Sequence, residues 1–226
     1  SLIVTQPDSL LAIVNSVDLL CNGLCQGHAS SIVTGGSAPY QYQWDDADSQ
    51  TTLSATGLCS GTYNVTVTDT NNCITMAQVM VSEPTILSLM SNSNDISCVG
   101  ICDGFVGVAP SGGVGPYEYL WDDPLNQTND TAIGLCPGIV CVTVIDSNSC
   151  SIQSCFTIND AVALSTTINT TDALCYGDCS GLASLTPTGG FGAYTYLWND
   201  PSNQTNSLAI DLCAGNYSVT VSDSNN

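Results

Sequence analysis

The sequence PYQYQW at residues 39–44 recurs as PYEYLW at 116–121 and as AYTYLW at 193–198. In each case alternation places both tyrosines and the tryptophan on one face of a predicted strand. Trp44, Trp121 and Trp198 are separated by 77 residues, and the cysteines keep the same spacing without insertion or deletion. A period of this length is too long for a helical solenoid repeat and suits one small β-sandwich. The chain is therefore predicted to contain copies of a single module.

The frame of the repeat predicts the domain boundaries. Residues 1–7 align with 78–84 and are expected to be the end of a preceding repeat. Residues 8–84 and 85–161 form two β-sandwich repeats, and 162–226 form a third that stops before its last strand. Because no spacer separates the copies, they are expected to stack end to end as a semi-rigid linear array, each advancing roughly 35–45 Å.

Within one copy the pattern predicts only strands, at about residues 10–20, 29–34, 40–44, 51–54, 63–68 and 74–81. The third strand carries Trp44, and Tyr63 follows the turn at 58–61. A tryptophan in the third strand and a tyrosine after a corner are typical of immunoglobulin-like sandwiches. The predicted fold class is all-β, with tandem immunoglobulin-like β-sandwich domains that contain disulfides.

Composition restricts the partners of this chain. It has 226 residues, no Lys or Arg, 20 acidic residues and a formal charge of −20. Without cationic side chains it cannot neutralise phosphates, so nucleic-acid binding and direct contact with anionic membranes are excluded. The expected partners are other copies of the repeat, surface glycans and cations.

The cysteines indicate an oxidising compartment. Thirteen cysteines at regular places, with one histidine, are typical of disulfides in a secreted protein. Four cysteines in one copy allow three pairings, and a zinc site is the alternative. The second copy adds Cys141 and Cys155, which alternation places on the outward face of its last two strands. These two are expected to form a cross-strand disulfide.

The combination of motifs resembles a known family. The second copy contains CVGICDG at 98–104, GG at 112–113, PYEYLW at 116–121, LCPG at 135–138 and DSNSC at 146–150. This combination resembles the SprB-type repeat of Bacteroidetes cell-surface adhesins. The resemblance implies an exported, extracellular protein at the cell surface that carries adhesive or structural repeats. Departures occur at Val140, Ala161 and Ala193.

The resemblance also implies a disulfide pairing. Family members with two cysteines keep the first and the last, which implies Cys21 with Cys73 and leaves Cys25 with Cys59. Cys175 is then expected to lack a partner. The full expected set is Cys21–Cys73, Cys25–Cys59, Cys98–Cys150, Cys102–Cys136, Cys141–Cys155 and Cys179–Cys213.

Two sets of side chains are candidates for ligand binding. The loop aspartates Asp46, Asp123 and Asp200 offer oxygen ligands for calcium. A solvated turn is the simpler interpretation, and the sequence suggests no other cofactor. The stripe formed by Tyr40 and Trp44 could stack on sugars or belong to the core. The core interpretation is favoured, because a third-strand tryptophan usually anchors a sandwich.

Catalysis is not expected. His28 is the single histidine, and the other copies have Phe105 and Leu182 in its place. No general base therefore recurs with the module, and the serines have no activating partner. The chain is predicted not to be an enzyme.

Several positions match glycosylation motifs. Asn-x-Ser/Thr sequences occur at Asn64, Asn126, Asn129, Asn169, Asn203 and Asn216. A Bacteroidetes-type Asp-Ser/Thr-apolar motif occurs at Ser9 and Thr131. These residues are candidate acceptors.

The function expected from these observations is that of a structural or adhesive segment of an extracellular repetitive surface fibre. A lectin-like module that binds glycans is the alternative. Loss of glycan binding on changing Tyr40 or Tyr117 would favour the second.

Overall fold

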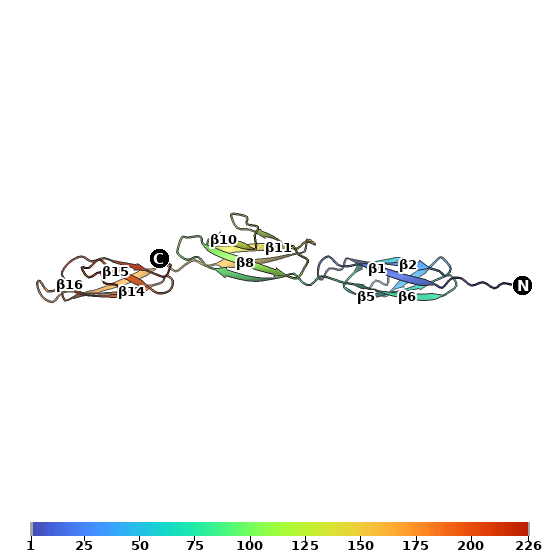
Figure 1. The fold of residues 1–226 in the computed structure, drawn as a ribbon, viewed down its shortest axis with the longest axis horizontal. Helices are drawn as coiled ribbons and strands as arrows, with labels where there is room; N and C mark the ends of the chain where they lie inside the picture. The colour runs from blue at the N-terminus through green and yellow to red at the C-terminus, as the bar shows by residue number, and fades with distance from the viewer. Residues whose placement is uncertain (1, 226) are drawn as a thin grey trace. The chain divides into compact units, whose positions relative to one another are not determined.

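The computed structural model describes residues 2–225, and all regular secondary structure in that range is β-strand (Figure 1). The chain divides into two compact units. One comprises Ser1–Met90, Ala109–Tyr119 and Thr143–Gln153, and the other Ser91–Val108, Leu120–Val142 and Ser154–Asn226. The first unit thus contains the first repeat together with one end of the second. The repeat boundaries at 8–84, 85–161 and 162–226 remain a prediction.

Each repeat contributes strands at matching positions. The first contains β1 (Leu11–Val17), β2 (Gly27–Thr34), β3 (Gln41–Trp44), β4 (Ser54–Leu58), β5 (Gly61–Thr68) and β6 (Ile74–Val81). The second contains β7 (Ser88–Asn94), β8 (Gly104–Ser111), β9 (Glu118–Trp121), β10 (Thr131–Leu135), β11 (Gly138–Ile145) and β12 (Ser151–Ile158). The third contains β13 (Ser165–Thr171), β14 (Gly181–Thr188), β15 (Thr195–Trp198), β16 (Leu208–Leu212) and β17 (Val219–Ser222).

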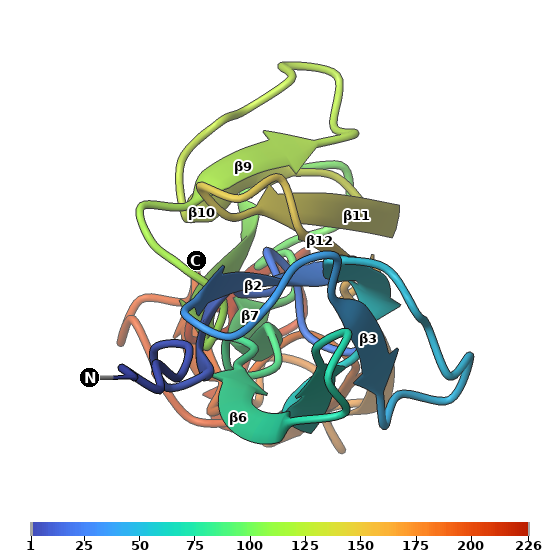
Figure 2. The same ribbon diagram turned by 90° about the vertical axis from the view of Figure 1, so that its right-hand side faces the viewer.

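The strands of each repeat form two sheets in the immunoglobulin order. In the first repeat the orders are β1-β2-β4 and β3-β5-β6, all antiparallel neighbours. The second repeat has β7-β8-β10 and β9-β11-β12, and the third has β13-β14-β16 and β15-β17. β2 and β6, from opposite sheets of the first repeat, lie at separate levels in the end-on view (Figure 2). The predicted tandem immunoglobulin-like sandwiches are confirmed.

The two sheets of the first repeat enclose one core. Trp44 from β3, Val65 and Val67 from β5, and Val81 from β6 pack with the buried residues of β2 and β4. Each of these valines is essentially inaccessible to water. Burying a side chain of this size stabilises the fold by about 1.5–3 kcal/mol. Period-two alternation in β5 therefore decides which face of the strand lies in the core.

The tyrosine after the corner behaves as the immunoglobulin comparison predicts. Tyr63 Oη donates a hydrogen bond to Cys59 O at 3.0 Å, and Tyr217 Oη donates to Cys213 O at 3.1 Å. A bond from this tyrosine back to the backbone just upstream characterises the corner in such sandwiches. The second repeat has Val140 at this position, where it is buried instead.

The fourth strand lies further along the chain than predicted. It spans Ser54–Leu58 instead of 51–54, because Ala55 and Leu58 supply the buried positions. The preceding segment forms a turn that receives the indole, since Trp44 Nε1 donates to Thr52 O at 2.9 Å. The β propensity of Thr51 and Thr52 favours a strand at 51–54, but in the structure these two residues lie outside the sheet.

β1 also lies beside β6 and runs in the same direction. Ser16 Oγ donates to Met80 O, and Leu19 N donates to Ser82 O, both at 2.9 Å. The C-terminal ends of β1 and β6 therefore lie at the same end of the sandwich. The turn that precedes β6, with Cys73, lies at the other end.

Candidate functional site at the junction between repeats

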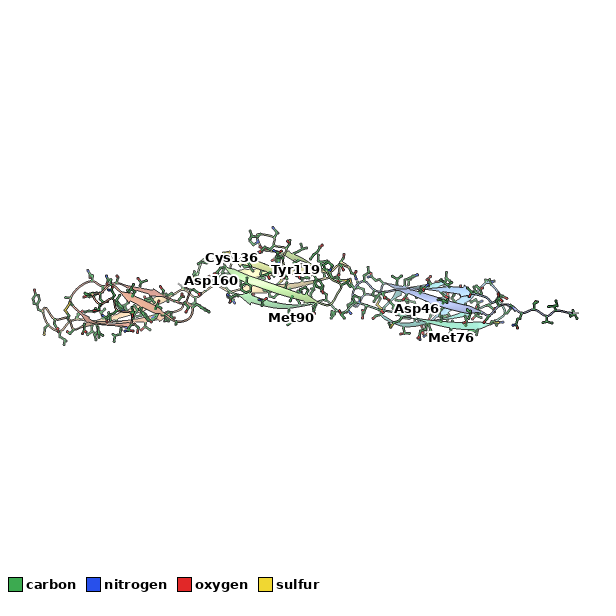
Figure 3. The ribbon with its side chains drawn as sticks, in the orientation of Figure 1. Asp46, Met76, Met90, Tyr119, Cys136 and Asp160 are labelled. Atoms are coloured by element: carbon green, nitrogen blue, oxygen red, sulfur yellow. A yellow bond between two sulfur atoms is a disulfide. The ribbon has the colours of Figure 1, made fainter. Side chains whose placement is uncertain are left out.

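The calcium candidates are used inside their own loops. Asp46, which follows β3 (Figure 3), is 7% exposed. Its carboxylate accepts hydrogen bonds from Asp48 N at 3.2 Å, from Gln50 N at 3.0 Å and from Gln50 Nε2 at 2.9 Å. Asp123 and Asp200 accept the equivalent bonds in the other repeats.

The glutamine partner links this loop to β4. Gln50 Nε2 donates to Thr56 O at 3.0 Å, and Gln50 Oε1 accepts from Thr56 N at 3.1 Å. The side chain thus pairs with the edge of β4 as a neighbouring strand would. Gln127 and Gln204 make the same two bonds. The same hydrogen-bond network occurs in each of the three repeats, which indicates that the aspartates organise the loop.

The protonation behaviour of these aspartates agrees with that role. Burial raises the pKa of Asp46, but the hydrogen bonds from Gln50 and Asp48 together outweigh it and hold the pKa below the ordinary value. The same balance lowers the pKa of Asp123. A calcium ion would have to displace these donors. Across residues 2–225, no group of three or more His, Cys, Asp or Glu side chains is arranged to hold a metal ion.

The neighbouring acidic position serves as an acceptor for the facing strand. Asp45 Oδ1 accepts from Asn64 N at 2.7 Å, and Asp122 Oδ1 accepts from Cys141 N at 2.6 Å. In the third repeat Asn199 Oδ1 accepts from Ser218 N at 2.7 Å. An asparagine can replace the aspartate here because only an oxygen acceptor is required.

The aromatic stripe belongs mostly to the core. Trp44 is 1% exposed, and Tyr40 and Tyr42 are half-buried against the same cluster. Tyr40 Oη donates to Gly35 O at 2.7 Å. Burial, and then the neighbouring Tyr40, raise the pKa of Tyr42. Rings already packed and hydrogen-bonded in this way offer little free face for a sugar.

Four disulfides lie within repeats. They are Cys25–Cys59, Cys102–Cys136, Cys141–Cys155 and Cys179–Cys213. The first, second and fourth occupy equivalent places and tie the loop before the second strand to the corner after the fourth strand. Cys136 is labelled in Figure 3. All four pairs are among those expected from the sequence.

The pairings Cys21–Cys73 and Cys98–Cys150 are wrong, because Cys21 is bonded to Cys150. Cys21 follows β1, whereas Cys73 immediately precedes β6, which runs parallel to β1. The eight residues of β6 span about 26 Å at 3.3 Å per residue. A disulfide requires Cα atoms within about 7 Å. The first cysteine of a repeat and its last therefore lie at opposite ends of the sandwich.

The first cysteine instead meets the turn of the following repeat. The Cα atoms of Cys21 and Cys150 are 5.7 Å apart, an ordinary separation for a disulfide. Asn148 Nδ2 donates to Leu20 O at 2.8 Å beside the bond. Asp146 holds that turn, because its carboxylate accepts from Asn148 N and Cys150 N, both at 2.9 Å. All five residues belong to the first compact unit.

The linker between these repeats is held from the same side. Asn22 Nδ2 donates to Pro84 O at 3.0 Å, and Gly23 N donates to Glu83 Oε2 at 2.7 Å. The loop that follows Cys21 thus contacts the peptide connection as well as the disulfide. The junction has two covalent connections, one through the backbone and one through Cys21–Cys150.

The same contact recurs one period later in the second compact unit. Asn225 Nδ2 donates to Ser97 O at 2.8 Å. Asn225 and Ser97 are the counterparts of Asn148 and Leu20. Cys98 directly follows Ser97 and is a free thiol of intermediate exposure, and Cys73 and Cys175 are exposed free thiols. Sequence reasoning missed this contact between repeats, although the 77-residue spacing of the Asn-x-Cys turn is its signal.

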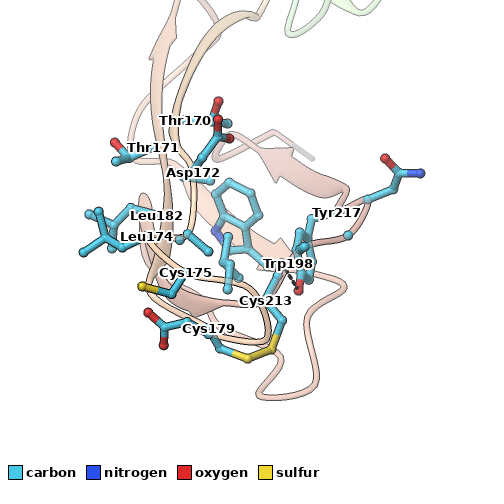
Figure 4. A pocket seen from close by; sticks show the side chains of 18 of the residues that line it. Thr170, Thr171, Asp172, Leu174, Cys175, Cys179, Leu182, Trp198, Cys213 and Tyr217 are labelled. Carbon is cyan, nitrogen blue, oxygen red and sulfur yellow. Dashed lines mark hydrogen bonds between the residues drawn. A yellow bond between two sulfur atoms is a disulfide. The ribbon is translucent and has the colours of Figure 1, made fainter.

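The hollow in the third repeat lies where the first two repeats have their last strand. It is lined by Trp198, Leu212, Tyr217 and their neighbours (Figure 4). In the first two repeats the last strand fills this space, where Val81 approaches Gly27 and Ile158 approaches Gly104. Among residues 2–225, the third repeat has no strand that corresponds to β6 or β12. The hollow therefore supplies no argument for a small-molecule ligand.

The glycosylation candidates differ in accessibility. Ser9, Asn126, Asn129, Asn169, Asn203 and Asn216 are exposed. Thr131 is half-buried in β10, and Asn64 is half-buried in β5. Asn64 Nδ2 also donates to Asp45 Oδ2 at 2.7 Å. Glycosylation stays a prediction, with Asn64 the least accessible nitrogen.

The position of the single histidine does not change the prediction about catalysis. His28 lies in β2, with its backbone paired to Val17 and Thr56. That the chain is not an enzyme stays a prediction. The described residues include no helix long and apolar enough to cross a membrane.

Comparison with known families agrees with the repeat. The SprB repeat model matches residues 13–49, 90–126 and 167–203, which fall one in each copy. The chain is a tandem array of SprB repeats. No curated protein sequence matches it.

Two solved structures show weak similarity to the SprB array. A structure described as a tetra-tandem repeat in the extending region of a large adhesion protein is 14% identical, covers 94% of this chain and 66% of its own, and has a TM-score of 0.25. A structure on Dscam isoform specificity is 11% identical, covers 67% of this chain and has a TM-score of 0.29. The SprB array spans 46% of that Dscam chain. At these TM-scores the likeness carries no functional argument.

Proposed function

We propose that this array is a structural segment of an extracellular, repetitive surface adhesin, in which the repeats act as a spacer. The observation that carries the proposal is the junction, where successive repeats are joined both by peptide and by Cys21–Cys150. A module whose recurring hydrogen bonds and disulfides hold its own loops and its neighbour is suited to extension. SprB repeats are associated with cell-surface adhesins, which supports the same role.

An extracellular location is part of the proposal. Five disulfides occur among the described residues, and disulfides persist in oxidising compartments. A chain with a charge of −20 and no Lys or Arg repels others of its kind at low salt. Lateral contact between such segments would therefore need cations or glycans to bridge them. End-to-end contact with other repeats is the partner interaction that we propose.

Glycan binding is the less supported function. The rings of Trp44 and its neighbours pack in the core, and Tyr40 Oη is already bonded to Gly35 O. A glycan-array signal that is lost in the variant Y40A or Y117A, which lacks the ring, would nevertheless replace our proposal. Y63A is the matched control, because Tyr63 lies outside the stripe but packs against the same core.

Small-angle scattering tests the spacer function. Three repeats that each advance roughly 35–45 Å would give a radius of gyration of about 30–39 Å for a rod. A compact globule of 226 residues would give about 17 Å. We expect the larger value for the oxidised chain. A value near that of the globule would contradict a spacer role.

A further inference from the structure

We infer that the first cysteine of each repeat is a cross-linking site for the turn cysteine of the repeat that follows it, so that Cys98 is a linkage site for a cysteine at the Asn-x-Cys position of the third repeat's turn. The inference goes beyond the spacer function, because it assigns a covalent site to a residue that is free in this chain. It rests on two observations, one in each compact unit.

The first observation is the bond that already exists. Cys21 and Cys98 are equivalent by the 77-residue period, and Cys21 is bonded to Cys150 in the Asn-x-Cys turn of the next repeat. The residue equivalent to Cys150 in the third repeat would directly follow Asn226. The rule therefore assigns to Cys98, a free thiol here, the same role that Cys21 has in the first repeat.

The second observation is that the register needed for the bond is present. Asn148 Nδ2 donates to Leu20 O next to Cys21, and Asn225 Nδ2 donates to Ser97 O next to Cys98, both at 2.8 Å. Asp223 also holds its turn as Asp146 does, since it accepts from Asn225 N and from Phe191 N. The turn of the third repeat is therefore positioned beside Cys98 without the help of a disulfide.

The same rule accounts for the other two thiols. Cys73 occupies the turn position of the first repeat, so its partner would be the first cysteine of a repeat on its N-terminal side. Cys175 is the first cysteine of the third repeat, so its partner would be the turn cysteine of a repeat on its C-terminal side. Both are exposed, as a linkage to another copy of the repeat requires.

The chemistry is thiol–disulfide exchange with a small-molecule disulfide as oxidant. The thiolate of Cys98 attacks the oxidant, which releases one thiol and leaves a mixed disulfide on Cys98. The thiolate of the partner cysteine then attacks Cys98 Sγ and releases the second thiol. Two protein thiols lose two electrons and two protons, and the oxidant is reduced to two thiols.

The test adds one residue to the chain. One form carries a single cysteine after Asn226, and the matched control carries a serine there. Both are oxidised in a glutathione buffer and alkylated, and the alkyl groups are counted by intact mass. We expect three alkyl groups on the control, from Cys73, Cys98 and Cys175, and two on the cysteine form.

Peptide mapping without reduction identifies the partners, with thermolysin in place of trypsin because the chain has no Lys or Arg and because Val99, Val142 and Ile152 give cleavage sites between neighbouring cysteines. We expect the Cys98 peptide joined to the C-terminal peptide, and the Cys21 peptide joined to the Cys150 peptide in both forms. A fourth alkyl group, or an added cysteine paired with Cys73 or Cys175, would overturn the inference. So would Cys21 joined to Cys73.

A second variant separates register from chance proximity. In the cysteine form, N225A removes the bond to Ser97 O, and we expect the cross-link to Cys98 to form about five-fold more slowly, as the loss of one hydrogen bond implies. N206A, on an exposed loop of the same repeat, is the control and should leave the rate unchanged. Equal rates in N225A and the parent would count against the register argument. None of these outcomes depends on the spacer function.

Discussion

At the scale of single residues, the acidic side chains have two different roles. Most of the 20 acids keep the surface charged, whereas five aspartates are buried and accept backbone hydrogen bonds, namely Asp46, Asp69, Asp123, Asp146 and Asp200. Asp69 connects two loops, because it accepts from Cys73 N at 2.9 Å and from Ser37 N at 3.0 Å. A small fraction of the negative charge thus organises the loops at both ends of the sandwich.

The variant D46A should destabilise the first repeat. It removes the carboxylate that accepts from the N–H groups of Asp48 and Gln50, and hydrogen bonds to a charged group contribute about 1.5–3 kcal/mol. Urea unfolding should show a loss of that size. D48A removes the same charge from an exposed residue and should change the free energy of unfolding by less than about 0.5 kcal/mol. Similar effects of the two variants would refute the bracing role of Asp46.

Acid should weaken the loops held by Asp69. Hydrogen bonds, first from Cys73 N, lower the pKa of Asp69 below its ordinary 3.8. Because the folded-state pKa lies below the unfolded value, the carboxylate stabilises the fold above about pH 4, and this contribution disappears as the pH falls through the folded pKa. Carbon-detected NMR titration should place the Asp69 midpoint below 3.8. A midpoint at or above that value would contradict the hydrogen-bonded geometry.

At the scale of strands, the two sheets approach each other closely at the start of β2. A Cβ added to Gly27 would lie 2.7 Å from Val81 Cγ1 and 2.8 Å from Leu58 O. Gly104 has the same surroundings with Ile158. Glycine at this position therefore lets the last strand of each sandwich seal the core.

The variant G27A tests this packing. We expect a loss of about 1–3 kcal/mol in the free energy of unfolding, because overpacking forces β2 and β6 apart. G61A is the control, since a Cβ there would meet only Tyr63 atoms, at 3.7–3.8 Å. Its effect on a urea midpoint should be small. If G27A were as well tolerated as G61A, the sheets would not be in contact at Gly27.

At the scale of the whole molecule, the bond between Cys21 and Cys150 creates a second covalent path. Tension applied at the termini passes from Cys21 directly to Cys150, whose sequence separation is 129. The residues between them carry no load while the bond is intact. The fold of the second repeat is thereby protected from extension along most of its length.

Single-molecule stretching of the variant C21S/C150S should reveal this path. The load would then pass through the remaining disulfides at Cys25, Cys102 and Cys141. The covalent path lengthens by about 47 residues, which adds roughly 170 Å to the fully extended chain. The variant C179S/C213S, which opens a loop within the third repeat, is the control and should add its own 34-residue loop, roughly 120 Å. An unchanged length for C21S/C150S would show that the bond carries no load.

The sequence alone determined the number and nature of the modules. The 77-residue period, the alternation in β5 and the place of Trp44 predicted the sandwich, because side-chain direction in a strand follows from position. The last strand, at 74–81, was placed correctly. The fourth strand lies later than predicted, because Thr51 and Thr52 have the higher β propensity whereas burial of Ala55 and Leu58 decides where the strand forms.

Only the tertiary structure decided which ends of the strands meet. Periodicity shows which face of a strand is buried but not which cysteines share an end of the sandwich. The parallel course of β1 and β6 places Cys21 far from Cys73 and next to Cys150 of the following repeat. In the same way, the sequence left the loop aspartates as solvated turns or calcium ligands, and they turn inward because their own backbone supplies the donors.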